Sequence, residues 1–289
     1  MSDLYLSDPW HKMGPTPLIQ ISPGIFCKLE TVNPTGSIKD RLVKYIVEDA
    51  LCKKAITGET ILIEATSGNT GISLSAIGAS LGLPVKIIMP KNMSNERKQM
   101  ILAFGAEIIE VDDNNFIQAI DVRNQMIDTD KNYWSPMQFE NALNIECHRS
   151  TTAQEILSQL PKSGSLSAFI SGAGTGGTIM GVRKALVEKG LSTHVCLVHP
   201  AEDDGEHGIQ GINDGADFLV NHDLLDMKIP VRTVDAKFRA QKFAHEMGVL
   251  VGISSGANIW AAEKYRQTIK PSGSIVTILC DRGERYLST

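Results

Sequence analysis

Hydrophobic residues occur along this chain in short continuous runs, and each run precedes a longer stretch in which apolar positions recur every three or four residues. The runs are rich in β-branched side chains and predict strands at 25–30, 61–65, 85–89, 106–111, 167–171, 194–198 and 274–279. The periodic stretches predict helices at 40–54, 72–82, 95–105, 116–128, 151–160, 178–190 and 238–248. Gly82, Gly105 and Gly190 end three of these helices and are expected to form left-handed caps.

The alternation of strands and helices predicts an α/β fold in which helices connect parallel strands. The runs are apolar throughout rather than at every second position, which fits sheets that helices cover on both faces. A chain of 289 residues is long enough for two domains. We therefore expect two domains, each with a mainly parallel sheet flanked by helices.

Composition and charge exclude several classes of function. The net charge is −5 and the chain has no basic stripe, so a nucleic-acid partner is not expected. No stretch approaches the roughly 18 consecutive apolar residues of a membrane span, and acidic residues stand where a signal peptide needs positive charge. These features predict a cytoplasmic protein. The five cysteines and seven histidines form no C-x-x-C or H-E-x-x-H pattern, and we predict no metal site.

Three loops that follow predicted strands carry the candidate chemistry, because ligands of open parallel sheets bind beyond the carboxyl ends of the strands. The first loop, at 33–41, contains Ser37, Lys39 and Asp40. Ser37 suits a helix N-cap and Asp40 follows as in a capping box, which would place Lys39 in the first turn. A helix N-terminus disfavours positive charge and thus favours the neutral amine that forms a Schiff base. A solvated surface lysine is the alternative.

The second loop, at 64–71, combines hydroxyl and amide side chains with two glycines at a predicted helix start. Its polar members are Thr66, Ser67, Asn69 and Thr70. Donors that converge at a helix N-terminus suit a carboxylate or a phosphate. A capped turn without a ligand is the alternative.

The third loop, at 171–178, has four glycines in six positions, at 172, 174, 176 and 177. Glycine weakens regular elements, so this density favours a backbone that approaches a phosphate closely. The pattern is neither G-x-G-x-x-G nor a P-loop, and a phosphate monoester fits it better than a pyrophosphate. An amine, a carboxylate site and a phosphate site together predict pyridoxal phosphate chemistry on an amino acid.

The three motifs, N-P-T-G-S-I-K-D-R at 33–41, T-S-G-N-T-G at 66–71 and G-T-G-G-T at 174–178, resemble in this order the fold type II (tryptophan synthase β-like) pyridoxal-phosphate enzymes. Further motifs at 14–18, 138–139, 252–257 and 281–289 resemble more closely the cysteine synthases (O-acetylserine sulfhydrylases), in particular the B isozyme. The resemblance spans essentially the whole chain.

The resemblance implies roles for particular residues. Lys39 would hold pyridoxal 5'-phosphate covalently and, once freed, would remove the substrate α-proton. Asn69 would bind the ring hydroxyl and Ser254 would face the pyridine nitrogen. The cofactor phosphate would be bound by Gly174, Thr175, Gly176, Gly177 and Thr178. The substrate carboxylate would be bound by Thr66, Ser67, Asn69, Thr70 and Gln138.

The resemblance also implies a domain division, with the cofactor in the cleft between the domains. Residues 36–145 would form a smaller, mobile domain that binds the substrate carboxylate. Residues 1–35 with 146–289 would form a larger domain that binds the cofactor phosphate. The implied reaction is a β-replacement that makes L-cysteine from O-acetyl-L-serine and sulfide through an α-aminoacrylate intermediate.

Alternatives and partners stay open at this point. The alternatives are an O-phosphoserine sulfhydrylase, a cystathionine β-synthase-type lyase, a serine or threonine dehydratase, an idle paralogue that acts as a binding protein, and a nucleotide-binding protein. Relatives are usually homodimers, and Trp10 is a candidate interface residue. Serine acetyltransferase is a further candidate partner. Cys280 is expected to be a packed thiol, with a redox role as the alternative.

Overall fold

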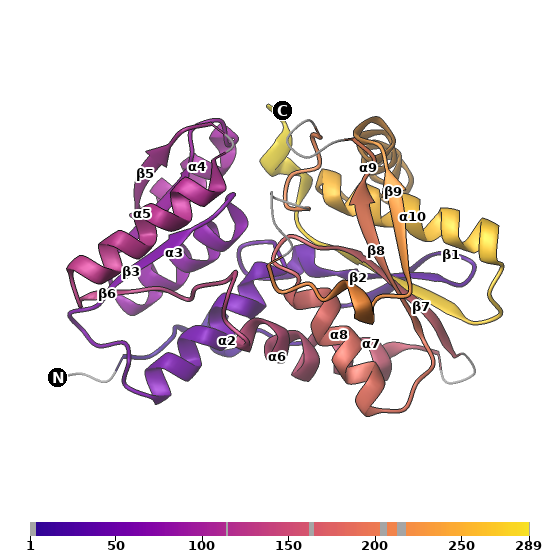
Figure 1. The fold of residues 1–289 in the computed structure, drawn as a ribbon, viewed down its shortest axis with the longest axis horizontal. Helices are drawn as coiled ribbons and strands as arrows, with labels where there is room; N and C mark the ends of the chain where they lie inside the picture. Colours follow the sequence, from indigo (N-terminus) through magenta and orange to yellow (C-terminus); the bar gives the residue numbers. More distant parts are fainter. Residues whose placement is uncertain (1–3, 114, 162–164, 203–206, 213–217, 289) are drawn as a thin grey trace. The chain divides into compact units, whose positions relative to one another are not determined.

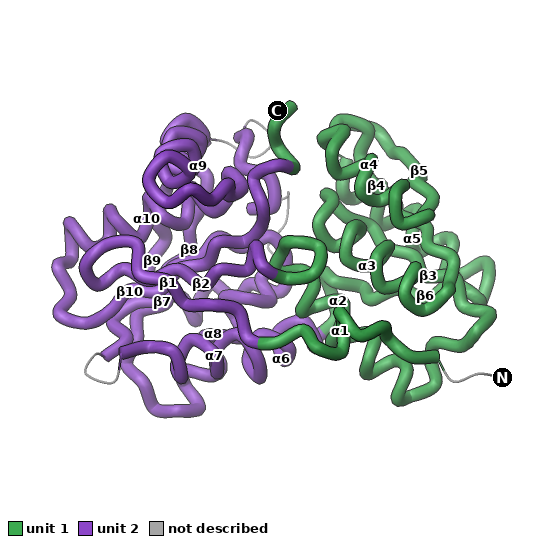
Figure 2. The backbone as a smooth tube through the Cα atoms, turned by 180° about the vertical axis from the view of Figure 1, so that it is seen from behind, with its two compact units in different colours: residues 1–14, 33–141, 285–289 green, residues 15–32, 142–284 purple. Residues whose placement is uncertain are grey.

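The computed structural model describes residues 4–113, 115–161, 165–202, 207–212 and 218–288, and it confirms the α/β fold (Figure 1). The chain forms two compact units, coloured separately in Figure 2. Unit 1 comprises Met1–Gly14, Asn33–Asn141 and Arg285–Thr289, and unit 2 comprises Pro15–Val32 and Ala142–Glu284. The predicted boundaries near 36 and 145 lie within a few residues of these divisions. The prediction differs at both chain ends, which it assigns to the larger domain.

Unit 1 is built on a four-stranded parallel sheet. Its strands, in spatial order, are β5 (Glu107–Val111), β4 (Val85–Pro90), β3 (Ile61–Ala65) and β6 (Tyr133–Trp134). Its helices are α1 (Asp8–His11), α2 (Lys39–Cys52), α3 (Asn69–Leu81), α4 (Asn95–Ala103) and α5 (Phe116–Thr129). Successive residues of β3 enter two different hydrophobic clusters: Leu62 packs with side chains of α2 and α3, whereas Ile63 packs with Ala119 of α5. Helices therefore cover both faces of the sheet, as its continuous hydrophobicity predicts.

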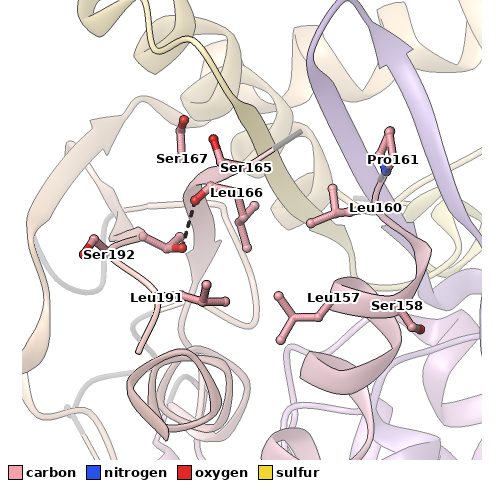
Figure 3. A pocket seen from close by; sticks show the side chains of 10 residues that line it. Leu157, Ser158, Leu160, Pro161, Ser165, Leu166, Ser167, Leu191 and Ser192 are labelled. Atoms are coloured by element: carbon pink, nitrogen blue, oxygen red, sulfur yellow. Dashed lines mark hydrogen bonds between the residues drawn. The ribbon is translucent and has the colours of Figure 1, made fainter. Parts of the chain in front are cut away.

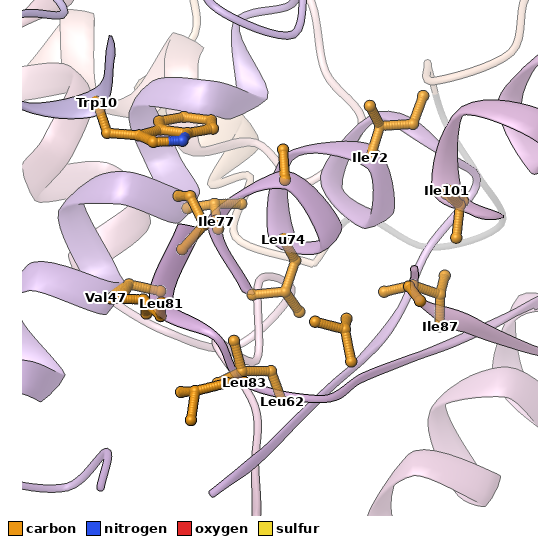
Figure 4. Close-up of a cluster of buried hydrophobic side chains, with 14 of the residues drawn as sticks. Trp10, Val47, Leu62, Ile72, Leu74, Ile77, Leu81, Leu83, Ile87 and Ile101 are labelled. Atoms are coloured by element: carbon orange, nitrogen blue, oxygen red, sulfur yellow. The ribbon is translucent and has the colours of Figure 1, made fainter. Parts of the chain in front are cut away.

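Trp10 belongs to the larger of these two clusters. Its side chain is 4% exposed and packs in the same core as Leu74, Ile77 and Leu81 of α3 (Figure 4). The side chain is therefore part of the core of unit 1. The hypothesis that it forms a subunit interface is wrong, because the indole is already covered by the chain's own residues.

Unit 2 is built on a six-stranded sheet. Its strands, in spatial order, are β1 (Leu18–Ser22), β2 (Ile25–Leu29), β10 (Ser274–Leu279), β7 (Leu166–Gly172), β8 (His194–Pro200) and β9 (Met227–Val231). Only the β1–β2 pair of these strands is antiparallel. Its α-helices are α6 (Leu143–Ser150), α7 (Thr152–Gln159), α8 (Gly177–Glu188), α9 (Thr233–Met247) and α10 (Ile253–Ile269). Short 3-10 turns are η1 (Glu30–Val32), η2 (His222–Leu224) and η3 (Gly283–Tyr286), the last of which begins in unit 2 and ends in unit 1.

The seven predicted strands are all confirmed, and so are the seven predicted helices, with boundaries shifted by a few residues. Gly82, Gly105 and Gly190 adopt φ angles of 70°, 83° and 64°, which confirms their left-handed conformation. The sequence does not predict the helices α1, α6 and α10 or the strands β1, β6 and β9. Each of these three strands lies at the edge of its sheet.

Candidate cofactor and substrate site

Lys39 is the first residue of α2, so the predicted position at a helix start is confirmed. The predicted capping box is wrong. The N-cap residue is Ile38, and Ser37 accepts a hydrogen bond from the Lys39 backbone N–H through Oγ, at 3.3 Å. The carboxylate of Asp40 does not complete a capping box with Ser37, because it accepts hydrogen bonds from other residues of unit 1.

Asp40 is completely buried and connects the lysine loop to helix α3. Its carboxylate accepts hydrogen bonds from the backbone N–H of Thr35, at 2.7 Å, and from the hydroxyls of Thr35 and Ser73. Burial raises the pKa of Asp40 above its usual range, and the hydrogen bonds from Ser73 and Thr35 oppose that change. The residue next to Lys39 is therefore an anchor that fixes the loop rather than a group open to solvent.

The second loop lies at the N-terminus of α3, with Gly68 as the N-cap residue at φ 143°. Thr66 accepts the Gly68 N–H through Oγ1 at 3.0 Å. Thr70 donates its hydroxyl to Gln138 Oε1 at 2.6 Å, and Gln138 Nε2 donates to the carbonyl of Ala65 at 3.0 Å. The structure thus brings Gln138 to the loop, as the predicted substrate-binding set requires. Ser67 and Asn69, the other two members of the set, are partly exposed on the same loop.

The third loop lies in unit 2 between β7 and α8, whose helix begins at Gly177. Neighbouring atoms of the protein itself explain part of the need for glycine in this loop. A Cβ at Gly174 would lie 2.7 Å from the carbonyl oxygen of Gly211, and one at Gly177 would lie 1.8 Å from Asn144 Oδ1. Gly176 adopts φ 89°. Contacts with the protein's own atoms therefore require glycine at positions 174 and 177, and a phosphate close to the backbone would make the same demand for small residues.

Polar side chains of α6 and α7 support the two threonines of this loop. Asn144 donates through Nδ2 to Thr175 Oγ1 at 2.9 Å. His148 lies 3.2 Å from Thr178 Oγ1 through Nε2 and 2.9 Å from Thr152 Oγ1 through Nδ1. Thr178 stands in the first turn of a 12-residue helix, where backbone N–H groups lack intrahelical acceptors. The loop therefore fits a phosphate monoester, which two hydroxyls and a helix N-terminus can bind.

Ser254, the residue expected to face a pyridine nitrogen, lies in the first turn of α10 and is 5% exposed. Its neighbour Ser255 accepts the backbone N–H of Cys280 through Oγ at 2.9 Å. Cys280 itself is a partly buried thiol whose Sγ lies 3.6 Å from Asn258 Nδ2. This packing favours a structural role for Cys280.

A cavity of about 490 Å³ opens in unit 2 away from these loops (Figure 3). It is lined by Ser165 and Leu166 at the start of β7, by Thr193 just before β8, and by Leu157 of α7. The glycine-rich loop follows the opposite, carboxyl end of β7. The cavity is thus separate from the predicted phosphate site, which lies where parallel sheets bind ligands.

Sequence reasoning missed the side chains that hold these loops in place. Arg123 on α5 forms an ion pair at 3.1 Å with Glu64, the first residue of the second loop. Arg285, near the C-terminus, donates to Asn69. Asn144 and His148 support the third loop. Arg285 lies in the 281–289 motif of the family resemblance, which was the one available signal, whereas Arg123 stands in an ordinary amphipathic pattern.

Two negative findings concern the described residues. Within them, no group of three or more His, Cys, Asp or Glu side chains is arranged to hold a metal ion. No helix among the residues that the structure describes is both long enough and apolar enough to cross a lipid bilayer.

The two α/β units together carry a lysine at one helix start, a hydroxyl-rich loop at a second and a glycine-rich loop at a third. These features define the fold type II class of pyridoxal-phosphate enzymes. The family model described as "Pyridoxal-phosphate dependent enzyme" matches residues 10–281. The chain belongs to this family, and its cofactor is pyridoxal phosphate.

Comparison with individual proteins gives a more specific similarity than the family model does. Cysteine synthase B of Campylobacter jejuni is 42% identical, over 96% of this chain and 95% of the relative. A solved structure of a hydrogen sulfide-producing enzyme from Fusobacterium nucleatum is 36% identical, with a TM-score of 0.91 over 98% of this chain and 100% of that one. O-acetylserine sulfhydrylase isoform 3 of Entamoeba histolytica is 35% identical, with a TM-score of 0.87 over 98% of this chain and 90% of that one.

Proposed function

We propose that the protein makes L-cysteine from O-acetyl-L-serine and sulfide by β-replacement. The observation that carries the proposal is the loop at the start of α3, where Thr70 and Gln138 are joined at 2.6 Å in the same unit as Lys39. An amino-acid substrate needs a carboxylate site near the reactive lysine, and this loop has the donors for it. The names of the Campylobacter and Entamoeba relatives support the same activity.

The residues present fit pyridoxal phosphate in both units. In unit 2, Thr175, Thr178 and the backbone of Gly174, Gly176 and Gly177 would bind the phosphate at the α8 N-terminus. In unit 1, Lys39 would hold the cofactor covalently and Asn69 would donate to its ring oxygen. The bound cofactor supplies an electron-withdrawing ring that makes the substrate's α-hydrogen acidic.

Side chains of the protein would carry out proton transfer, orient the substrate and contact the ring nitrogen. Lys39, once its amine is released, would take the substrate's α-proton at Nζ. Thr66, Ser67, Asn69, Thr70 and Gln138 would bind the α-carboxylate and so orient that proton toward the lysine. Ser254 would offer a neutral hydroxyl to the ring nitrogen, which leaves that nitrogen without a proton and favours loss of the β-substituent.

The test is a direct assay on purified protein. The protein should be yellow, and hydroxylamine should remove the colour. With O-acetyl-L-serine and sulfide it should release L-cysteine, and Lys39→Ala should lose at least about a thousandfold in rate, as expected when a covalent catalytic group is removed. Lys44→Ala is the matched control, because Lys44 lies on the same helix and pairs with Glu48 at 2.8 Å. A wild-type rate in Lys39→Ala would refute the mechanism.

The choice of donor is the next question. O-acetyl-L-serine, O-phospho-L-serine and L-serine, compared at equal concentration by stopped-flow absorbance, should rank in that order. Fastest reaction with O-phospho-L-serine would support the phosphoserine alternative. Fastest reaction with L-serine would support a cystathionine β-synthase-type lyase or a dehydratase.

Partners and location are part of the same proposal. We expect a cytoplasmic homodimer that binds the C-terminal tail of serine acetyltransferase, as the family resemblance implies. Light scattering would give the mass of the assembly, to be compared with the 31.4 kDa chain. A synthetic peptide of that tail, titrated into the holoenzyme, should compete with O-acetyl-L-serine. A monomeric mass would refute the homodimer, and the absence of competition would refute binding of the serine acetyltransferase tail.

A further inference from the structure

The C-terminal segment Arg285–Ser288 is packed onto unit 1, although residues 142–284 before it belong to unit 2. Arg285 is 2% exposed, and its carbonyl oxygen accepts a hydrogen bond from Ser94 Oγ at 2.8 Å. Ser288 donates through Oγ to Glu96 at 2.7 Å. Two contacts with the start of α4 therefore fix the segment at both of its ends.

The guanidinium of Arg285 joins the two loops that carry the unit 1 part of the site. Nη1 donates to Asn69 Oδ1 at 2.7 Å, and Nη2 donates to the backbone carbonyl of Thr35. Thr35 belongs to the lysine loop and Asn69 to the loop of the proposed carboxylate site. A single planar group with fixed donors thus sets the spacing of the two loops.

This contact also decides which way the Asn69 amide points. A guanidinium carries only donors, so the atom that it binds must be the amide oxygen. The other arm of the amide, Nδ2, is then a donor on the opposite side of the group. In the proposed site Asn69 faces the ring oxygen of the cofactor, which accepts hydrogen bonds, so this orientation is the productive one.

A second contact of the same segment supports the neighbouring backbone. The ring of Tyr286 lies 4.5 Å from the guanidinium carbon of Arg97, a cation–π distance. Arg97 in turn donates through Nη1 to the carbonyl oxygen of Ser67 at 3.1 Å, and its Cδ occupies the space that a Cβ at Gly68 would need. The segment therefore contacts Asn69 directly, and it acts on the two residues before Asn69 through Arg97.

We propose that Arg285 is a positioning residue that holds the Asn69 amide with its donor toward the cofactor, and that the segment Arg285–Ser288 completes the unit 1 part of the site. The inference rests on the proposed function only in its assignment of Asn69 to the cofactor. It gives the D-R-G-E-R-Y-L-S-T motif a physical role that the proposed reaction does not use.

The first test compares Arg285→Lys with Arg282→Lys. Lysine keeps the positive charge near Asp40 but is a point donor that cannot bind Asn69 and Thr35 as a fork. The affinity of the apoprotein for pyridoxal phosphate, titrated by absorbance, should fall about tenfold in Arg285→Lys, the loss of roughly one hydrogen bond. Arg282 is exposed and donates to Thr31 O at 2.8 Å in unit 2, so Arg282→Lys should stay near the wild-type affinity. Equal affinities in all three proteins would overturn the proposal.

The second test asks whether Arg285 acts through Asn69. In an Asn69→Ala background, Arg285→Lys should add little further loss, because the group that it positions is gone. Two independent, additive losses would indicate a general structural role and overturn the proposal. Thermal unfolding of each apoprotein accompanies the titrations as a check on the fold.

A third variant, Asn69→Asp, does not depend on any change at Arg285. Aspartate still accepts the Arg285 hydrogen bond but presents an acceptor where the asparagine presents a donor. Its affinity for pyridoxal phosphate should fall below that of Asn69→Ala, and unchanged affinity would overturn the orientation argument. Failure of the proposed function looks different: wild-type protein would bind the cofactor normally and yet release no cysteine from O-acetyl-L-serine.

Discussion

Arg123 Nη1 lies 3.1 Å from Glu64 Oε1, and neither side chain is exposed to solvent. Glu64 stands at the carboxyl end of β3, one residue before the Ala65–Thr66 step into the proposed carboxylate loop. Its Oε1 also accepts the Ala65 N–H at 2.8 Å, and its Oε2 accepts the Gln138 N–H at 3.0 Å. The buried pair therefore fixes the backbone of Gln138 relative to the loop that its side chain contacts.

Removing one partner of this pair should be costly. Burial raises the pKa of Glu64, and Arg123 opposes that change, so Arg123→Met leaves a buried carboxyl without its counter-ion. We expect the free energy of unfolding, measured with urea, to fall by about 3–5 kcal/mol. Lys53→Met is the control in the same unit, because the Lys53–Asp49 pair is exposed and should contribute at most about 1 kcal/mol. Equal losses in the two variants would contradict this account.

The glycine-rich loop gives a second prediction. Gly177→Ala places a Cβ 1.8 Å from Asn144 Oδ1. Gly177 is the first residue of α8 and already has a helical backbone, so the expected destabilisation comes from this clash and not from φ. We expect a loss of about 1–3 kcal/mol in the apoprotein from overpacking, together with weaker binding of pyridoxal phosphate.

Two further variants separate these effects. The double variant Gly177→Ala/Asn144→Ala should recover stability relative to Gly177→Ala, because the clashing amide is absent. It should not recover cofactor affinity, because Thr175 has lost the hydrogen bond from Asn144. Gly58→Ala, at an exposed glycine with no heavy atom within 4 Å of the added Cβ, should leave both properties unchanged. A double variant that is as unstable as Gly177→Ala alone would show that the steric explanation is wrong.

The sequence predicts the interior of the fold better than its edges. Six of the seven predicted strands lie in the interior of a sheet, whereas the three strands that were not predicted, β1, β6 and β9, lie at sheet edges and carry mixed patterns. The edge strand β5 is the exception, and its adjacent Ile108 and Ile109 give it a strand signal. In β9 only Ile229 and Val231 are buried. Edge strands bury less surface, so they need less hydrophobic sequence and give a weaker signal.

The same distinction applies to the candidate site. Local patterns identify Lys39 and the two polar loops, because glycines, hydroxyls and helix starts are signals that neighbouring residues carry. They do not identify Arg123 or Asn144, whose partners lie 59 and 31 residues away. They also assign Ser37 and Asp40 to a capping box, whereas Asp40 is bound by Thr35 and Ser73. Tertiary partners decide the use of a buried polar side chain, and one sequence does not contain that information locally.

Thiol reactivity offers a third prediction. Cys52 is exposed, Cys280 is partly buried, and Cys27, Cys147 and Cys196 are buried. A disulfide reagent at pH 8 should therefore modify Cys52 rapidly in the native protein and leave the three buried thiols unmodified until the protein unfolds. Mass spectrometry after short labelling would show this order. Rapid labelling of Cys27 or Cys196 in the native protein would contradict the buried positions of these side chains.

Alkaline pH should weaken the fold through Cys196. Burial, and to a smaller extent the carboxylate of Asp226, raises the pKa of this thiol from 9.0 to about 12. The unfolded chain therefore releases the thiol proton at lower pH than the folded one. Below pH 9 both states keep the proton, and between pH 9 and 12 stability falls by about 1.4 kcal/mol per pH unit.

Cys196→Ala isolates this contribution, because its cavity cost does not depend on pH. Urea unfolding at pH 7.5 and pH 10 should show the advantage of the wild type over this variant shrinking by about 1.4 kcal/mol over that interval. Burial, and to a smaller extent Cys196, also raises the pKa of Tyr265, so both proteins carry Tyr265→Phe in this comparison. Cys52→Ala, at an exposed position, serves as the control for loss of a thiol from the surface. A constant difference for Cys196→Ala would mean that this thiol ionises as easily in the folded protein as in the unfolded chain.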